Sequence, residues 1–172
     1  FPPIAKLNAQ QAAYLFISGY TSKVAGTEAG ITEPQTTFSN CFGAPFMPLH
    51  PTKYAKMLSE KVESSNVNVW LINTGWNGQK KRMSLKDTRT VINAALSGEL
   101  DNATFRQDPF FGFQIPEKVE GVDAEKLDPA TSFDSPEAYE KNAVILAGKF
   151  KENFKKFEEF ASEELLAGGP II

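Results

Sequence analysis

A strand-like run that leads through a short turn into a capped helix constrains the fold of this chain more than any other feature. Residues 67–72 are almost continuously apolar, and the turn at 73–78 contains two glycines and two asparagines. Three consecutive cations at 80–82 then precede a helix that is predicted to start at Ser84. Anions and nucleotides bind favourably beside a helix N-terminus, because its first N–H groups are unpaired. The segment therefore predicts a basic loop suited to such a ligand.

The start of this helix brings three candidate binding residues together. Ser84 is predicted to be the N-cap and Asp87 the third helical residue, which is an acidic variant of the capping box. Met83 and Thr88 then occupy the two positions that meet in a hydrophobic staple, and Arg82 lies one residue further out. A guanidinium plane, a thioether and a hydroxyl on one surface suit a purine and its ribose. The alternative is structural, with Met83 and Thr88 as a staple and Arg82 as a solvated cation.

Composition indicates an ordinary globular domain and excludes several functions. The chain has 172 residues, enough for one domain with a core, and its hydrophobic and charged shares of 41% and 23% are typical of soluble proteins. The net charge of -3 predicts no general affinity for nucleic acid or anionic membranes. No apolar run approaches the ~20 residues of a membrane helix. The single cysteine, Cys41, excludes an internal disulfide and favours a reducing compartment, with the cytoplasm as the default.

Helix and strand signals follow one another along the chain without repeats. Helices are expected wherever a capping residue or proline precedes an apolar periodicity, at 8–18, from His50-Pro51, at 84–96 and over 135–164. Strands are expected at 67–72, buried on both faces, and at 110–115. Segments without a period, 20–37 and 117–134, are expected to be long connections.

The C-terminal helix, which begins at Ser135, presents one apolar face. Its members are Ala143, Leu146, Ala147, Phe150, Phe154, Phe157 and Ala161. A row of phenylalanines on one helix face is typical of a docking face, and a cofactor or membrane role is the alternative.

Residues of the usual catalytic types are sparse. The only histidine, His50, precedes Pro51 and is interpreted as a cap or packing residue, and Cys41 is expected to be buried rather than nucleophilic. One histidine and one cysteine cannot form the usual zinc site. The chain also contains no G-x-x-x-x-G-K-[ST] phosphate-binding loop. We therefore expect no catalytic residue and no metal ligand in this chain.

Three segments carry a resemblance to a known family. They are residues 18–28 (SGYTSKVAGTE), 37–46 (TFSNCFGAPF) and 73–89 (NTGWNGQKKRMSLKDTR). Together they resemble the C-terminal third of the ATP-dependent phosphoenolpyruvate carboxykinase family, and the resemblance covers almost the whole chain. It implies an α/β fold in which residues 1–172 are the C-terminal portion of the mononucleotide-binding domain, with helices around a mixed sheet.

The resemblance also implies an activity, the conversion of oxaloacetate and ATP to phosphoenolpyruvate, CO₂ and ADP by a carboxy-lyase of gluconeogenesis. The implied cofactors are ATP, Mg²⁺ and Mn²⁺. In the family the phosphate-binding loop, the metal ligands and the oxaloacetate-binding arginines lie in upstream segments. The implied partners are therefore oxaloacetate, ATP and the N-terminal portion of the enzyme, and the isolated chain is expected to be inactive. A homo-oligomer is left open.

The resemblance assigns roles to particular residues. Arg82, Met83 and Thr88 match the family positions that contact the adenine and ribose of ATP, and the position of Met83 is often Ile. Residues 20–34 resemble a lid that closes over the nucleotide, and its candidate residues are Thr21, Ser22, Lys23, Gly26, Thr27 and Gly30. The alternatives are a plain connector for the lid, and for the chain a stand-alone adenine-nucleotide-binding module or an inactive fragment.

Overall fold

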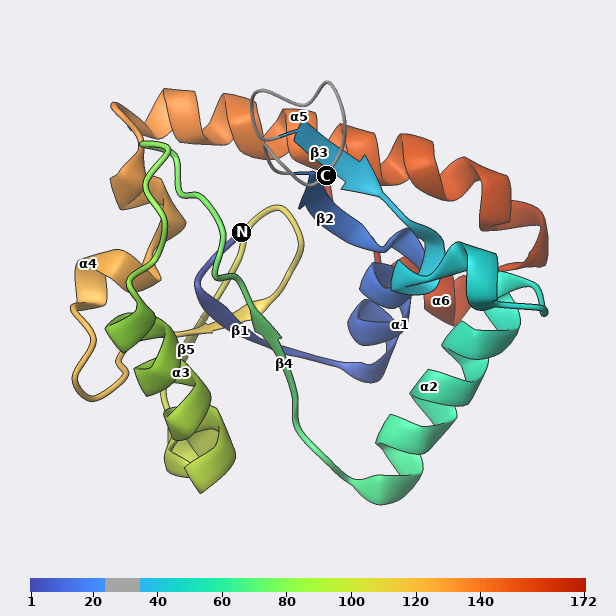
Figure 1. The fold of residues 1–172 in the computed structure, drawn as a ribbon, viewed down its shortest axis with the longest axis horizontal. Helices are drawn as coiled ribbons and strands as arrows, with labels where there is room; N and C mark the ends of the chain where they lie inside the picture. The colour runs from blue at the N-terminus through green and yellow to red at the C-terminus, as the bar shows by residue number, and fades with distance from the viewer. Residues whose placement is uncertain (24–34) are drawn as a thin grey trace. The chain divides into compact units, whose positions relative to one another are not determined.

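An antiparallel four-stranded sheet with the order β4-β1-β6-β5 organises the first of two units in the chain. The computed structural model describes residues 1–23 and 35–172. The first unit consists of Phe1–Leu7, Asn68–Gly148 and Ile171–Ile172, and the second of Asn8–Val67 and Lys149–Pro170. Figure 1 labels the α-helices of both units and strands β1 to β5. The presence of helices and a sheet confirms the predicted α/β class.

Strand β1 (Ile4–Leu7) lies between β4 (Val69–Ile72) and β6 (Gln114–Pro116), and β5 (Phe105–Gln107) pairs with β6. All of these pairings are antiparallel. The strand expected at 67–72 forms, but the expected burial on both faces is wrong, because each residue of β4 is only half-buried. Within this sheet β4 pairs with β1 alone, so it occupies one end of the strand order.

The strand expected at 110–115 forms only at its end, because β6 begins at Gln114 and residues 110–113 are not in a strand. The apolar residues after Pro109 form a turn instead, because the Asp108 carboxylate accepts hydrogen bonds from the backbone N–H groups of Phe110 and Phe111, at 3.1 and 2.6 Å. The extended segments lie on either side of this turn, as β5 and β6.

Helix α3 (Leu85–Ser97) forms as predicted and packs on the core of the first unit. The Ser84 hydroxyl accepts a hydrogen bond from the Asp87 N–H at 3.0 Å, and Gly98 ends the helix with a φ of 79°. Gly98 also precedes a short 3₁₀ turn, η3 (Glu99–Asn102). One cluster of buried residues in this core consists of Ile4, Val91, Ala94, Leu100, Val119 and Leu127.

The connection expected at 117–134 contains two short helices, α4 (Ala124–Leu127) and η4 (Pro129–Ser132). Helix α5 (Pro136–Phe154) follows and begins as predicted, with the Ser135 hydroxyl accepting from the Ala138 N–H at 3.2 Å.

In the second unit, α1 (Ala9–Ser18) packs against α2 (Pro51–Ser65) and α6 (Glu163–Ala167). Both predicted starts are confirmed. Asn8 and Gln11 form a complete capping box, and Nδ1 of His50 accepts from the Thr52 N–H at 3.4 Å. Two 3₁₀ turns, η1 (Asn40–Phe42) and η2 (Ala44–Phe46), precede α2.

The segment 20–37 was expected to be an irregular loop, and this is wrong at both ends. Strands β2 (Tyr20–Lys23) and β3 (Gln35–Phe38) pair antiparallel, with Tyr20 opposite Phe38. A strand pair closed by many intervening residues has no local sequence signal, because its pairing is decided by contacts distant in sequence.

The expected helix over 135–164 is also not continuous. Helix α5 ends at Phe154 and is followed by η5 (Lys155–Phe160) and then α6. The Ser162 hydroxyl begins α6 by accepting from the Leu165 N–H at 3.3 Å, so a second cap interrupts the periodic pattern.

The phenylalanine face is confirmed as buried. Phe150, Phe154 and Phe157 are buried in the second unit, where Phe154 stacks on Tyr14 with ring centroids 4.0 Å apart and ring planes 9° apart.

Among the helices of residues 1–23 and 35–172, none is long and apolar enough to cross a membrane.

Candidate functional site

The loop between β4 and α3 is a small hairpin. Trp76 and Arg82 form an antiparallel β-bridge. Between them the Asn77 N–H donates to the carbonyl of Lys81 at 2.9 Å, and the Lys80 N–H donates to the carbonyl of Asn77 at 3.0 Å. The Asn77 side chain accepts from the Lys81 N–H at 2.9 Å. The loop predicted from its glycines and asparagines is therefore ordered by its own hydrogen bonds.

The base of the hairpin is tied to Pro3, the residue that precedes β1. The Asn73 N–H donates to the carbonyl of Pro3 at 2.9 Å, and its side-chain oxygen accepts from the Gly75 N–H at 3.0 Å. The Gly75 carbonyl in turn accepts from the Met83 N–H at 3.4 Å. These contacts join the end of β4 to the residue that precedes the N-cap of α3.

The tip of the hairpin is held from a segment far along the chain. The Gly78 N–H donates to the Ser132 hydroxyl at 3.0 Å, and that hydroxyl donates to the Pro129 carbonyl at 2.8 Å. A Cβ atom on Gly78 would lie 2.6 Å from both the Phe133 ring and the Ser132 carbonyl oxygen. Only glycine allows this close approach without a shift of the neighbouring segment.

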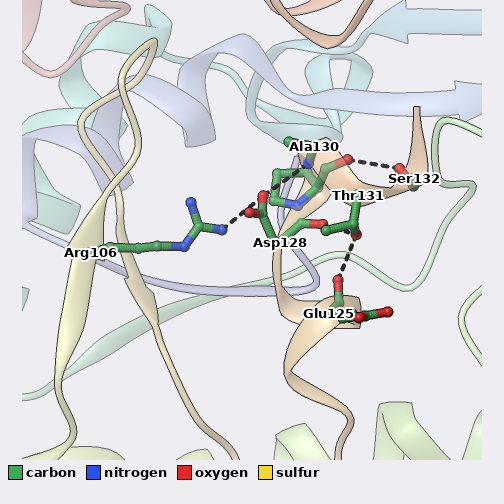
Figure 2. A network of polar contacts seen from close by, with 7 residues as sticks. Arg106, Glu125, Asp128, Ala130, Thr131 and Ser132 are labelled. Carbon is green, nitrogen blue, oxygen red and sulfur yellow. Dashed lines mark hydrogen bonds and ion pairs between the residues drawn. The ribbon is translucent and has the colours of Figure 1, made fainter. Parts of the chain in front are cut away.

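A network of polar contacts fixes the segment that carries Ser132 (Figure 2). The Asp128 carboxylate lies 3.0 Å from the Arg106 guanidinium and accepts from the Ala130 N–H at 2.9 Å. The Thr131 hydroxyl donates to the Glu125 carbonyl at 2.6 Å. The network thus links β5, α4 and η4, and places Ser132 beneath the hairpin tip.

A cavity of about 770 Å³ opens beside the hairpin within the first unit. Trp76, Arg82 and Met83 line it from the hairpin, and Ser84 and Asp87 line it from the start of α3. The opposite parts of the wall come from 108–111, 123–133 and the first turns of α5, and include Phe110, Phe133 and Tyr139. The cavity combines a cation, a soft apolar side chain and several aromatic rings.

The electrostatics of the cavity arise from mixed charges. The Asp87 carboxylate is buried and lies 3.0 Å from the Lys126 ammonium. Burial acts to raise the pKa of Asp87, but hydrogen bonds from Lys126 and Ser84 and the nearby positive charges outweigh it and lower the pKa. Burial raises the pKa of the Tyr139 hydroxyl, and the carboxylates of Asp108 and Asp128 add to this shift. Asp87 is therefore charged and Tyr139 neutral at pH 7.

The three predicted nucleotide residues have different places in the structure. Arg82 is exposed, with its guanidinium carbon 5.9 Å from the centroid of the Trp76 ring. Met83 is half-buried and packs against the core. Thr88 is half-buried and donates its N–H to the Ser84 carbonyl at 2.9 Å, but it is not among the described residues that line the cavity. The structure therefore brings Arg82 and Met83 to the cavity and does not bring Thr88 there.

Only part of the predicted lid lies among the described residues, and that part belongs to the second unit. Thr21, Ser22 and Lys23 lie in β2. Gly26, Thr27 and Gly30 lie outside the described residues. The lid assignment remains a prediction.

Two other residues behave as the sequence predicts. Cys41 is buried, and burial raises the pKa of its thiol, which disfavours the nucleophilic thiolate. His50 packs its ring 4.6 Å from that of Phe160, in addition to its capping role. Within the described residues, no three His, Cys, Asp or Glu side chains are grouped so that they could hold a metal ion.

Sequence reasoning missed Trp76 and Ser132. The Asn77-Gly78 signal predicts a two-residue loop and would place Trp76 opposite Gln79, whereas the structure places it opposite Arg82. No local signal identifies Ser132, which lies 54 positions from Gly78.

The fold and site define an α/β protein whose cavity is bordered by an anchored basic hairpin and a helix N-terminus. More specifically, the chain belongs to the phosphoenolpyruvate carboxykinase family, whose sequence model matches residues 1–125. It is similar to the phosphoenolpyruvate carboxykinase (ATP) of Flavobacterium johnsoniae, with 59% identity over 174 residues that cover 99% of this chain and 33% of that protein.

Two further relatives carry the same name. That of Caldanaerobacter subterraneus is 54% identical over 173 residues, covering 98% of this chain and 33% of that protein. That of Christiangramia forsetii is 53% identical over 174 residues, covering 99% and 33%. The chain thus spans about a third of the length of these relatives and corresponds to their C-terminal part.

Proposed function

We propose that the polypeptide carrying this chain converts oxaloacetate and ATP to phosphoenolpyruvate, CO₂ and ADP, and that this chain supplies the adenine and ribose side of the site. The position of Arg82 and Met83 on one cavity, beside the N-terminus of α3, is the observation that carries the proposal. The names of the relatives support the reaction.

In this proposal each residue has a distinct task. The planar guanidinium of Arg82 stacks on the base or donates hydrogen bonds to the base and ribose. Met83 supplies an apolar surface that adapts to a flat ring. Within the described part of the chain, Thr88 does not line the cavity, and its proposed contact with the ribose rests on its family position alone. Together these contacts orient ATP, so that the rest of the polypeptide can carry out the phosphoryl transfer.

The family implies Mg²⁺ and Mn²⁺, which neutralise charge on the transferred phosphate when bound. The carboxylates in the described residues do not form a suitable donor group, so we assign the metal ligands and the phosphate-binding loop to the other two thirds of the polypeptide. We also propose a cytoplasmic location, which the single buried cysteine supports. Self-association is open to measurement by sedimentation.

The test is a pair of Michaelis constants in the full-length polypeptide that carries this sequence. Arg82→Ala should raise KM for ATP roughly 5- to 150-fold, the equivalent of the ~1–3 kcal/mol of a hydrogen bond to a charged group. KM for oxaloacetate should not change. Lys80→Ala is the matched control, because Lys80 belongs to the same hairpin but does not line the cavity. If Arg82→Ala raised only the value for oxaloacetate, Arg82 would belong to the substrate side.

A stand-alone adenine-nucleotide-binding module is the second candidate, because the chain lacks a phosphate-binding loop yet contains the cavity. Titration calorimetry of the 172-residue chain with ATP distinguishes a binding module from an inert fragment. Under the main proposal, the same sample forms no phosphoenolpyruvate from oxaloacetate and ATP.

A further inference from the structure

The side chain of Trp76 lies beside that of Arg82 in the hairpin. The two residues face each other across the β-bridge, so their side chains project from the same face of the hairpin. The Arg82 guanidinium carbon lies 5.9 Å from the centroid of the Trp76 ring, which is within the range of a cation–π contact. Both side chains line the cavity, and Trp76 remains 43% exposed.

Arg82 has little else to fix its orientation. Within the described residues it forms no ion pair, although Asp87 lines the same cavity and is paired with Lys126 instead. A free arginine side chain has many rotamers, and a ligand that it binds must immobilise it at a cost in affinity. Because the Trp76 ring already contacts the guanidinium, the Arg82 side chain loses less conformational entropy when a ligand binds. The N–H edge of the guanidinium stays available to a ligand.

The hairpin itself is positioned to preserve this contact. Its base is tied to Pro3 through Asn73, and its tip is held by Ser132. The backbone between Trp76 and Arg82 is therefore fixed from both ends, and the pairing of the two side chains follows from that backbone.

We propose that Trp76 is a positioning residue, whose indole ring holds the Arg82 guanidinium toward the cavity and thereby sets the affinity for the adenine nucleotide. The inference rests on the proposed nucleotide role of Arg82. Trp76 acts through Arg82, so its removal should change ATP binding and leave the chemical step and the oxaloacetate site unaffected.

The experiment uses the full-length polypeptide with Trp76→Leu, which removes the ring, and Trp76→Phe, which keeps one. Trp76→Leu should raise KM for ATP about two- to fivefold, the range of a cation–π contact at an exposed site. KM for ATP in Trp76→Phe should lie closer to that of the unmodified protein. In both variants kcat and KM for oxaloacetate should be unchanged.

A double-mutant cycle separates this proposal from the one on which it rests. In an Arg82→Ala background, Trp76→Leu should have no further effect on KM for ATP. If Arg82→Ala alone left KM for ATP unchanged, the nucleotide assignment itself would fail. The positioning role alone would be overturned if Arg82→Ala raised KM for ATP and Trp76→Leu did not. It would also be overturned if the fold-change in KM of the double variant equalled the product of the two single fold-changes.

A spectroscopic measurement covers the case in which Trp76→Leu does not fold. In protein labelled with 5-fluorotryptophan, the Trp76 resonance is assigned by its loss in Trp76→Phe. It should shift in Arg82→Ala and again when ATP is added to the unmodified protein. If the Trp76 resonance had the same position in the unmodified protein, in Arg82→Ala and in the unmodified protein with ATP, contact between the two side chains would be contradicted.

Discussion

The backbone N–H of Gly78 donates a hydrogen bond to the hydroxyl of Ser132 at 3.0 Å, although the two residues lie 54 positions apart. This contact holds the tip of the hairpin that carries Arg82. Ser132 belongs to the segment that the Arg106–Asp128 ion pair fixes (Figure 2). The geometry of the candidate site therefore depends on residues that are distant from the hairpin in the sequence.

Gly78→Ala should displace the hairpin tip. The added Cβ would lie 2.6 Å from the Phe133 ring and from the Ser132 carbonyl oxygen, so the neighbouring backbone has to move. We expect a loss of about 1–3 kcal/mol in the free energy of unfolding, as for other overpacked sites. We also expect a higher KM for ATP in the full-length polypeptide. Urea denaturation and steady-state kinetics measure the two effects.

Gly148→Ala is the control for this change. A Cβ at Gly148, in helix α5, meets nothing within 4 Å. This substitution should be neutral or stabilising by up to about 1 kcal/mol, because alanine favours the helix. If Gly78→Ala and Gly148→Ala changed the free energy of unfolding equally, the hairpin tip would tolerate a side chain.

Ser132→Ala should loosen the hairpin without disrupting the fold. The Gly78 N–H loses its partner, but it is solvent-exposed and water can replace the hydroxyl, so we expect a loss of about 1 kcal/mol or less in stability. KM for ATP should rise and kcat should be retained. Ser132→Thr keeps the hydroxyl and should restore KM; if Thr and Ala gave the same value, the hydrogen bond would not position the hairpin.

The helix starts could be predicted because their signals are local. Asn8, Ser84 and Ser135 each accept a hydrogen bond from an N–H three residues further on, so a short stretch of sequence contains the whole interaction. The same reasoning placed Arg82 and Met83 beside the N-terminus of α3, and both line the cavity.

The strand pairings and the hairpin anchor could not be predicted, because they depend on distant partners. β2 pairs with β3 across the residues that separate them, and β1 pairs with both β4 and β6. The apolar residues Phe110 and Phe111 indicated a strand, but the Asp108 carboxylate captures their N–H groups in a turn. The proximity of Ser132 to Gly78 follows from packing, which no spacing in the sequence records.

Asp87 should contribute a pH-dependent part of the stability. Although burial acts to raise its pKa, hydrogen bonds from Lys126 and Ser84 lower it below the ordinary value of 3.8. A carboxyl whose folded-state pKa is depressed stabilises the fold above its unfolded-state pKa, and this contribution is lost as the pH falls through the folded-state value. We therefore expect stability to decrease below about pH 4, and this decrease to be shallower in Asp87→Asn.

Urea midpoints measured between about pH 2 and pH 7 test this expectation. Asp134→Asn, which removes a carboxylate at an exposed position before α5, is the control substitution. An Asp87→Asn curve parallel to that of the unmodified protein at all pH values would contradict the role of the Asp87–Lys126 pair.

Phe154→Ala should strongly destabilise the second unit. Phe154 is 1% exposed and stacks on Tyr14 at 4.0 Å, so truncation leaves a cavity beside α1. We expect a loss of about 3–5 kcal/mol in the free energy of unfolding. Phe46→Ala, at an 86% exposed position in η2, should change stability by less than about 0.5 kcal/mol. Similar midpoints for the two variants in a urea titration would mean that the aromatic face is not a core.

Met83 and Thr88 should respond differently to substitutions that nearly preserve their shape. Met83 lines the cavity and packs against the buried core cluster, so Met83→Ile keeps an apolar surface and should cost less than about 1.5 kcal/mol in stability. KM for ATP should stay within about twofold, because dispersion contact with a flat ring does not depend on the thioether.

Thr88→Val removes a hydroxyl and keeps the volume of the side chain. If Thr88 contacts the ribose, KM for ATP should rise by less than in Arg82→Ala, because a neutral hydrogen bond contributes only about 0.5–1.5 kcal/mol. Thr90→Val, which removes a hydroxyl that donates to the Lys86 carbonyl at 3.0 Å on the same helix, is the matched control and should leave KM for ATP unchanged. Equal values of KM for ATP in Thr88→Val and the unmodified protein would remove Thr88 from the nucleotide site. That result would agree with the structure, in which Thr88 is not among the described residues that line the cavity.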